Sequence, residues 1–350
     1  MRAPRPLVSI VIPTLGRPDA LARAAASALE QAPGGDDVEL VVVDNDPAGS
    51  AEAATLALRA PGVIPVRYVQ APEPGVANAR NAGVAAAHGD FIAFIDDDEI
   101  APPGWLDALL RTQRALDADV VFGPVRARLP DALVEHRRYF QSFFSRTGPT
   151  EAGLIESGHG CGNSLVRKAA LPHPTEPFCR TRNGTGGEDD LLFAAMQLRG
   201  ARFAWAPEAW LWEVPEVSRL TLGYTLKRAF AFGQGPCSAA AARGGYGVVI
   251  VPVWMAVGLV QFVGHGAGAL LAAATRAPML AAQLDRAARG LGKILWFSPF
   301  KIGFYGQGAL TRVPDGPACD GATDERHQRV DTAAGAGFRP GQPDLPARAS

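Results

Sequence analysis

The sequence has only four cysteines in 350 residues, and no two of them are close together. The positions Cys161, Cys179, Cys237 and Cys319 include no C-x-x-C pair. This spacing argues against a zinc site and against a disulfide framework. We therefore expect buried free thiols in a reducing compartment.

An excess of charge of either sign is also missing. Lys and Arg number 34 and Asp and Glu number 35, and the basic residues are dispersed along the chain. Composition therefore gives no reason to expect nucleic acid or acidic partners. The N-terminal apolar stretch at 7–12 is interrupted by Ser9 and stopped by Pro13, so it is too short for a signal peptide.

Apolar runs and helical patterns alternate through the first hundred residues. Strands are predicted at 8–12, 39–43, 66–69 and 91–95, and helices at 18–31, 51–59 and 76–87. This alternation predicts an α/β fold, with a mostly parallel sheet and helices on both faces.

The pattern is looser after residue 100. Helices are expected at 105–116 and 191–198, and strands at 120–128, 164–166 and 203–206, with 203–206 as the last strand along the chain. Residues 129–156 fit either an irregular, partly apolar segment over a site or a packed helix.

Four consecutive acidic residues, Asp96 to Glu99, follow the strand predicted at 91–95. At ~5 Å and an effective dielectric near 20, two such carboxylates repel by roughly 3 kcal/mol, so something must offset the repulsion. Ligands of open α/β sheets bind beyond the carboxyl ends of the strands, and oxygen clusters suit Mg²⁺ or Mn²⁺. The alternative is an acidic helix N-cap, for which one Asp would be enough.

Two further acidic groups also stand at strand or loop ends, at 44–46 and 188–190. A transferase that uses a nucleotide diphosphate donor needs carboxylates for the nucleoside, for a divalent ion and for a general base. The three groups match these three needs. Taken alone, however, Asp44 fits an Asx-turn, and Arg80 fits a surface ion pair as well as a phosphate contact.

The C-terminal part is apolar and then featureless. Residues 247–275 contain no charged residue and could span ~30 Å of hydrocarbon, although Pro252, Gln261 and His265 interrupt them. A buried core helix or an interfacial segment is also possible. The stretch 291–305 is aromatic and basic, as interfacial segments often are. We expect membrane association for this part, and a disordered tail from residue 314 onward.

Five short motifs in a fixed order resemble family 2 glycosyltransferases of the GT-A fold. They are VSIVIPT at 8–14, LVVVDN at 40–45, GVANARNAG at 75–83, FIDDDE at 94–99 and GGED at 186–189. The resemblance covers about residues 7–235, including the segment at 215–233. It implies a GT-A catalytic domain with a Rossmann-like sheet at 1–235. Composition alone predicts an apolar helical membrane-associating region at 236–312 and a disordered tail at 313–350.

The resemblance also implies roles for individual residues. Pro13, Thr14 and Asp44 would line the nucleoside pocket, and Arg80, Asp96 and Asp97 would contact the donor. Asp98 and Asp96 would hold a divalent metal, Mn²⁺ or Mg²⁺. Asp189 would be the catalytic base, supported by Glu188, although Asp190 follows directly and the assignment could slip by one position.

The activity so implied is inverting transfer of a single sugar from a nucleotide diphosphate sugar to a saccharide or lipid-linked saccharide. The chain lacks the Q-x-x-R-W motif that marks processive synthases. Cell-surface polysaccharide or glycolipid synthesis at the cytoplasmic face of the inner membrane is the expected setting. The alternatives are a non-catalytic, membrane-attached nucleotide-sugar-binding protein and a haloacid-dehalogenase-like phosphatase, whose motif the residues after Asp98 do not match.

Overall fold

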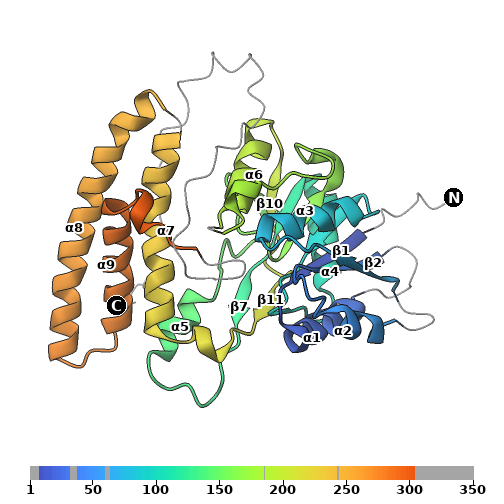
Figure 1. The fold of residues 1–350 in the computed structure, drawn as a ribbon, viewed down its shortest axis with the longest axis horizontal. Coiled ribbons are helices and arrows are strands. Elements are labelled where there is room, and N and C mark those ends of the chain that lie inside the picture. Colours follow the sequence, from blue (N-terminus) through green and yellow to red (C-terminus); the bar gives the residue numbers. More distant parts are fainter. Residues whose placement is uncertain (1–7, 32–37, 60–63, 185, 243, 304–350) are drawn as a thin grey trace, which may run out of the picture. The chain divides into compact units, whose positions relative to one another are not determined.

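The structure is a computed structural model that describes residues 8–31, 38–59, 64–184, 186–242 and 244–303. Its first half is a regular β-α alternation, as the sequence predicted (Figure 1). The strands are β1 (Val8–Thr14), β2 (Val38–Asp44), β3 (Val66–Gln70) and β4 (Phe91–Phe94). The helices between them are α1 (Pro18–Leu29), α2 (Glu52–Ala57) and α3 (Val76–Ala86). These four strands are parallel, in the order β3-β2-β1-β4.

The second half extends the same sheet with mixed directions. The full order is β3-β2-β1-β4-β9-β6-β10-β8, in which β9 runs antiparallel to both of its neighbours. The added strands are β6 (Val120–Phe122), β8 (Gly153–Ile155), β9 (Ser164–Arg167) and β10 (Phe203–Trp205). The expected mostly parallel sheet flanked by helices is confirmed.

Two strand predictions were wrong. The segment 120–128 is not one strand, because it breaks at Gly123 and continues as β7 (Val125–Ala127) in a second sheet. A Cβ at Gly123 would lie 1.9 Å from the carbonyl oxygen of Ala209, so only glycine fits at this position. The strand at 203–205 is also not the last, because β11 (Leu211–Glu213) pairs with β7 and with β5 (Glu99–Ile100) in that second sheet.

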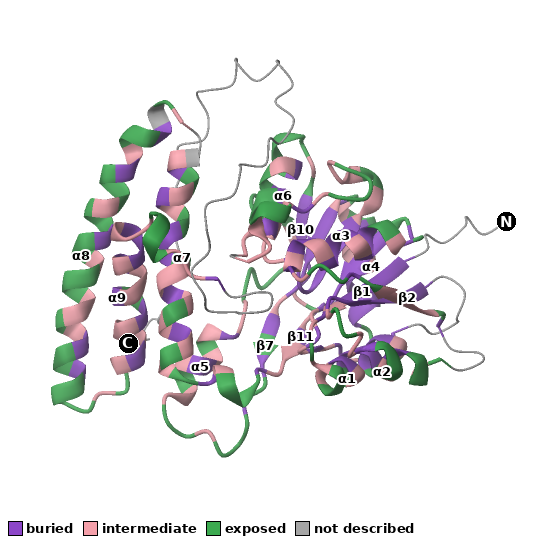
Figure 2. Ribbon diagram, in the orientation of Figure 1, coloured by how far each residue is buried: buried purple, intermediate pink, exposed green. Residues whose placement is uncertain are grey.

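The large sheet is buried on both faces (Figure 2). One apolar core lies under α1 and α4 (Trp105–Leu116), and the other lies under α3 and α6 (Glu188–Leu198). Strand side chains alternate between the two cores, so that Ile10 and Ile12 face one layer and Val11 faces the other. This sandwich holds the carboxyl ends of β1, β2 and β4 at a common edge.

The segment at 129–156 contains a short helix, α5 (Arg137–Phe143), besides β8. Phe140 and Phe144 are buried with Leu220 in a small core of their own. Helix packing, one of the two readings of this segment, is therefore confirmed for α5.

Three helices end the described chain: α7 (Leu222–Ala242), α8 (Tyr246–Ala274) and α9 (Leu280–Ile294). Helix α8 is the one described helix that is long and apolar enough to cross a membrane. Helix α7 runs without a break through residue 235, where the sequence suggested a boundary. The expected aromatic segment at 291–305 begins inside α9, and the tail predicted from residue 314 lies outside the described residues.

The cysteines are not all alike. Cys161 and Cys237 are buried free thiols, as expected. Cys179 is not among the free cysteines that the structure describes.

Candidate active site

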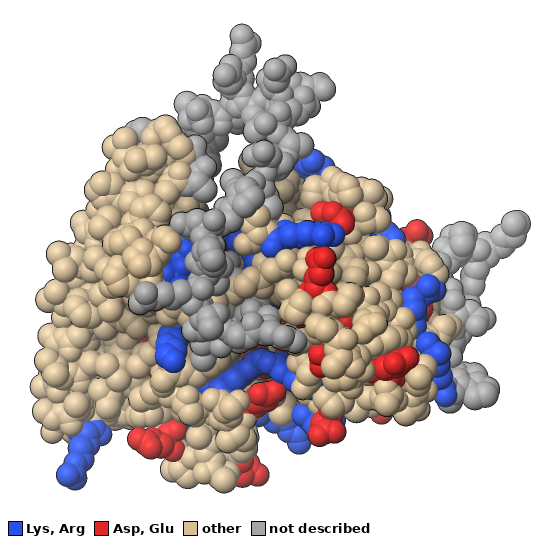
Figure 3. All heavy atoms as spheres, in the orientation of Figure 1, with Lys and Arg blue, Asp and Glu red and all other residues tan. Residues whose placement is uncertain are grey.

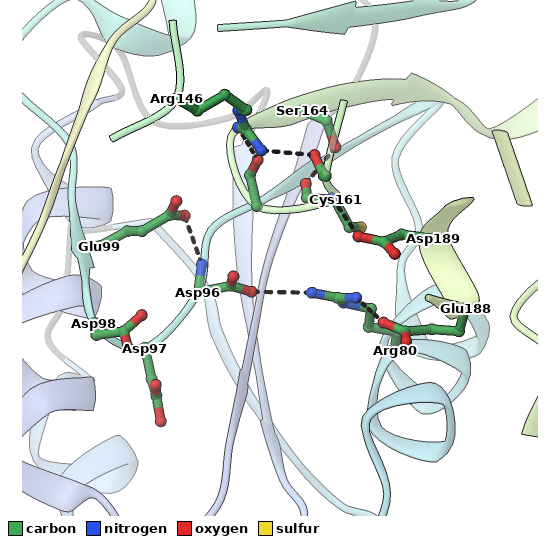
Figure 4. A network of polar contacts seen from close by, with 12 residues as sticks. Arg80, Asp96, Asp97, Asp98, Glu99, Arg146, Cys161, Ser164, Glu188 and Asp189 are labelled. Atoms are coloured by element: carbon green, nitrogen blue, oxygen red, sulfur yellow. Dashed lines mark hydrogen bonds and ion pairs between the residues drawn. The ribbon is translucent and has the colours of Figure 1, made fainter. Parts of the chain in front are cut away.

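The fold brings the two larger acidic groups of the sequence into one network. Asp96 to Asp98 follow β4 at the carboxyl edge of the sheet, and Glu188 to Asp190 form the first turn of α6. The third group, at 44–46, stands at the end of β2 on the same edge. Figure 4 shows the first two groups facing each other across Arg80.

Arg80 is the link between these two groups. Its Nη2 donates to Asp96 Oδ1 at 3.2 Å, and its Nη1 donates to Glu188 Oε1. The side chain comes from α3, is buried and lies 5.9 Å from the ring centre of Phe178. A buried guanidinium shared by two carboxylates fixes their separation, because moving either one would leave a charge unpaired.

Each acid of the 96–99 group has a different partner. Asp97 accepts from Thr14 Oγ1 at 2.8 Å and from Arg17 at 3.0 Å. Asp98 accepts from Arg219 Nη1 at 2.8 Å. Asp96 donates its backbone N–H to the Glu99 carboxylate at 2.9 Å. The repulsion that the sequence implied is thus offset in part by arginines.

The offset is incomplete. Burial, followed by the charges of Asp97 and Asp96, raises the pKa of Asp98 to about 7. The pKa values of Glu99 and of Glu213, which comes from β11, are raised well above their ordinary values by burial and by the neighbouring carboxylates. The group therefore has more carboxylates than its arginines neutralise.

This donor set suits a divalent cation chemically, because it consists of crowded carboxylate oxygens. Among the residues that the structure describes, however, no three Asp, Glu, His or Cys side chains are already grouped to hold an ion. Asp96 faces Arg80 and Asp98 faces Arg219, so the two expected metal ligands are turned to different arginines.

Two adjoining cavities open at this network. The first, of about 370 Å³, is lined by residues that include Pro13, Thr14, Arg17, Asn45 and Asp96 to Glu99. The second, of about 280 Å³, is lined by residues that include Phe143, Arg146, Gly160, Asp189 and Phe232. Seven residues line both cavities, so the cavities share a wall there: Arg80, Asp96, Glu99, Glu213, Arg219, Tyr224 and Arg228.

The second cavity distinguishes the two candidate bases. Asp189 lines it, and its Oδ2 accepts the backbone N–H of Cys161 at 3.1 Å. Asp190 is not part of the lining and is exposed. Although the residue as a whole is exposed, partial burial of its carboxylate and the charge of Asp189 raise the pKa of Asp190 to about 6.

Asp44 lies beside the first cavity without lining it. Its carboxylate is fully buried and accepts from the backbone N–H groups of Asp46 and Ala51 and from Tyr68. The neighbouring Asn45 lines the cavity instead, and its amide oxygen accepts the Gly75 N–H at 2.7 Å. Asp44 thus has the Asx-turn contacts that the sequence offered as an alternative.

Four site residues did not stand out in the sequence: Arg17, Arg146, Glu213 and Arg219. Arg17 ends the loop after β1 and also bonds Glu216 at 2.9 Å. Arg146 donates to the carbonyl oxygens of Gly160, Gly123 and Gly162. These bonds order the loop that contains Gly160 and Gly162, which line the second cavity. Of these four residues, only Arg219 had a signal in the sequence, because it lies in the 215–233 segment.

The sheet order, the acids after β4 and the paired cavities define an α/β domain with its ligand site at the carboxyl ends of the strands. The family model "Glycosyl transferase family 2" matches residues 9–173. The succinoglycan biosynthesis protein ExoM of Rhizobium meliloti is 34% identical over 228 residues, which cover 65% of this chain and 73% of ExoM. The chain belongs to the family 2 glycosyltransferases.

Other similarities agree with this assignment. The succinoglycan biosynthesis protein ExoO of Rhizobium meliloti is 35% identical over 115 residues, covering 33% of this chain and 32% of ExoO. A solved mannosyltransferase, PcManGT of Pyrobaculum calidifontis with GDP-Man and Mn²⁺, superposes with a TM-score of 0.55 at 18% identity, covering 83% of this chain and 88% of its own. At that identity the likeness shows the GT-A fold alone.

Proposed function

We propose that this glycosyltransferase moves one sugar from a nucleotide diphosphate sugar to an acceptor hydroxyl with inversion. The observation that carries the proposal is the pair of cavities with a common wall at Arg80, Asp96 and Glu99. A donor in the first cavity would present its anomeric carbon at that wall. An acceptor in the second cavity would approach the same carbon from the side of Asp189.

The donor would be held by the residues of the first cavity. Pro13 and Thr14 would contact the nucleoside together with Asp44 or its neighbour Asn45. Asp96 and Asp97 would lie at the ribose, and Arg80 would lie close to the diphosphate. Thr14 already bonds Asp97, which orders both side chains before a donor binds.

The chemistry would need one general base. Asp189 would take the proton of the acceptor hydroxyl as its oxygen attacks the anomeric carbon, and the bond to the diphosphate would break with its electron pair leaving on the diphosphate. Glu188 would position this step through Arg80. No covalent intermediate is required, because attack from the second cavity opposes departure into the first.

A divalent ion, Mn²⁺ or Mg²⁺, would be held by Asp98 and Asp96 and would supply Lewis-acid stabilisation of the leaving diphosphate. Support comes from the excess carboxylate charge of the group and from the Mn²⁺ in the PcManGT structure. Binding would require Asp98 to exchange its bond to Arg219 for the ion.

The names of two relatives support a proposal for the biological setting. ExoM and ExoO are named for succinoglycan biosynthesis, so we propose that this chain builds a cell-surface polysaccharide or glycolipid from a saccharide or lipid-linked saccharide acceptor. The absence of Q-x-x-R-W supports one addition per acceptor.

We also place the enzyme at the cytoplasmic face of the inner membrane, on the strength of apolar α8. The buried free thiols of Cys161 and Cys237 fit a reducing compartment. Thiol labelling of Cys179 in freshly lysed cells tests this location, and an oxidised Cys179 would count against it.

The deciding experiment is a thermal-shift screen of nucleotide diphosphate sugars with and without Mn²⁺. One donor should stabilise the protein, more so with the ion, and release of its nucleotide diphosphate should follow when an acceptor is added. A stabilising donor that is never consumed with any acceptor would favour the non-catalytic binding protein.

A further inference from the structure

Helix α8 has two unlike faces. Six of its large apolar residues are at least 60% exposed: Val249, Val253, Val260, Val263, Leu270 and Leu271. At 100° per residue these six fall within an arc of about 100°, so they form one stripe along the helix. We call this stripe the outer face of α8.

The opposite face of α8 packs on α9. Glycines allow the close approach, since a Cβ at Gly258 would lie 2.6 Å from the Gly290 carbonyl oxygen and one at Gly268 would lie 3.0 Å from Gln283. The polar side chains of α8 also turn this way. Gln261 accepts from Lys293 at 3.0 Å, and His265 bonds Gln283 at 2.7 Å.

The outer face therefore has few polar groups that could bond a partner. Residues 247–275 contain no charged side chain, and Figure 3 shows a broad surface without Lys, Arg, Asp or Glu over α8. Protein interfaces combine an apolar centre with a polar rim and about one hydrogen bond per 100–200 Å². A stripe about 33 Å long without such groups matches lipid hydrocarbon better than another protein surface.

The contacts of α9 decide how α8 meets the lipid. Asp285, on the part of α9 between Gln283 and Lys293, bonds Tyr139 of α5 at 3.2 Å and Arg289 at 2.7 Å. If α8 crossed a bilayer, these charged residues and α5 would lie at the depth of its middle. Charged side chains at that depth are strongly disfavoured.

We infer that α8 lies along the membrane surface with its outer face in the acyl chains and with α9 and α7 on the aqueous side. This inference rests on the membrane attachment proposed above and specifies its geometry. Because Tyr224, Arg228 and Phe232 of α7 line the second cavity, that cavity would lie close to the lipid surface, where a lipid-linked acceptor could reach it.

Vesicle flotation of the full chain tests the surface itself, with vesicles of phosphatidylcholine and phosphatidylglycerol. The double variant Val260→Glu/Leu270→Glu should bind at least tenfold more weakly than the wild type. The matched control Val134→Glu/Leu198→Glu changes residues that are 83% and 73% exposed outside α7–α9, and it should bind like the wild type. Equal loss in both variants, or no binding by the wild type, would overturn the inference.

Depth measurements distinguish a helix α8 that lies along the membrane surface from one that spans the membrane. Single variants Val249→Cys, Val260→Cys and Leu271→Cys, labelled with a fluorophore, should be quenched equally by lipids that carry a quencher at one depth. A much deeper Val260 position would show a spanning helix and overturn the inference. Sedimentation without vesicles tests whether a second copy of the chain covers the outer face. If the protein is a dimer and the Val260→Glu/Leu270→Glu variant is a monomer, the inference is overturned as well.

The result of the vesicle-binding experiment does not depend on sugar transfer. The outer face touches neither cavity, so the double variant should keep the wild-type rate with a water-soluble acceptor. Vesicle binding by a chain that transfers no sugar would refute the proposed function and leave this inference standing.

Discussion

Replacing Asp189 with asparagine tests the assignment of the base. The carboxylate accepts two backbone N–H groups, from Cys161 at 3.1 Å and from Asp190 at 2.9 Å. Asparagine has the same shape and keeps one acceptor oxygen, but it cannot take a proton. The fold should therefore survive while the chemistry fails.

The expected loss of stability and the expected loss of activity differ enough to be distinguished. Losing one hydrogen bond to a charged group costs about 1.5–3 kcal/mol of unfolding free energy, which most folded domains tolerate. Losing a general base slows the reaction about 10²–10⁴-fold, or roughly 3–5 kcal/mol of barrier. Nucleotide affinity should stay the same, because Asp189 lines the second cavity and not the first.

The assay combines release of nucleotide diphosphate with calorimetry of nucleotide binding to Asp189→Asn. Asp190→Asn is the matched control, since it alters the adjacent carboxylate outside the cavity lining. Its rate should stay within about threefold of the wild type. Unimpaired turnover in Asp189→Asn would refute the assignment, and a loss in Asp190→Asn alone would move the base by one residue.

Three further predictions concern the charged network. Asp98→Asn should weaken nucleotide binding in Mn²⁺ but not in its absence, and calorimetry that gives equal affinities would remove Asp98 from the metal site. Arg80→Met should lower the free energy of unfolding by about 3 kcal/mol, because it leaves Asp96 and Glu188 unpaired. Urea unfolding at pH 8, where Glu188 is ionised, measures this, and Arg80→Met/Glu188→Gln should recover part of the loss. A double variant as unstable as the single one would contradict the pairing. Burial raises the pKa of Glu188 to about 7 from 4.5, so the folded state favours its neutral form. The stability that this contributes is complete below pH 4.5 and is lost as pH rises through about 7. Between pH 5 and 8 the wild type should therefore lose roughly 1–3 kcal/mol relative to Glu188→Gln, whereas parallel pH profiles of stability would refute the shift.

Much of the α/β half was predictable because its signals are local. The helix at 105–116 was predicted at its observed bounds, because Pro102-Pro103-Gly104 marks the turn that introduces it. The strands β1 to β4 were found from apolar runs that end in polar residues, because parallel strands are buried on both faces.

The errors came where local pattern and long-range packing compete. Val120 to Arg128 reads as one apolar strand, yet the close approach of Ala209 to Gly123 divides it between two sheets. The strand at 211–213 is short and pairs with residues far away in sequence, so its own pattern gave no signal.

The sequence by itself determined the fold class, the family and the acidic residues at the strand ends, because each depends on residues that are neighbours in the chain. Only the tertiary structure decided which charges meet: Arg80 between Asp96 and Glu188, and Arg219 on Asp98. It also separated Asp189 from Asp190 and the outer face of α8 from its packed face. Such pairings depend on distances between segments that are remote along the chain, and neither composition nor periodicity encodes those distances.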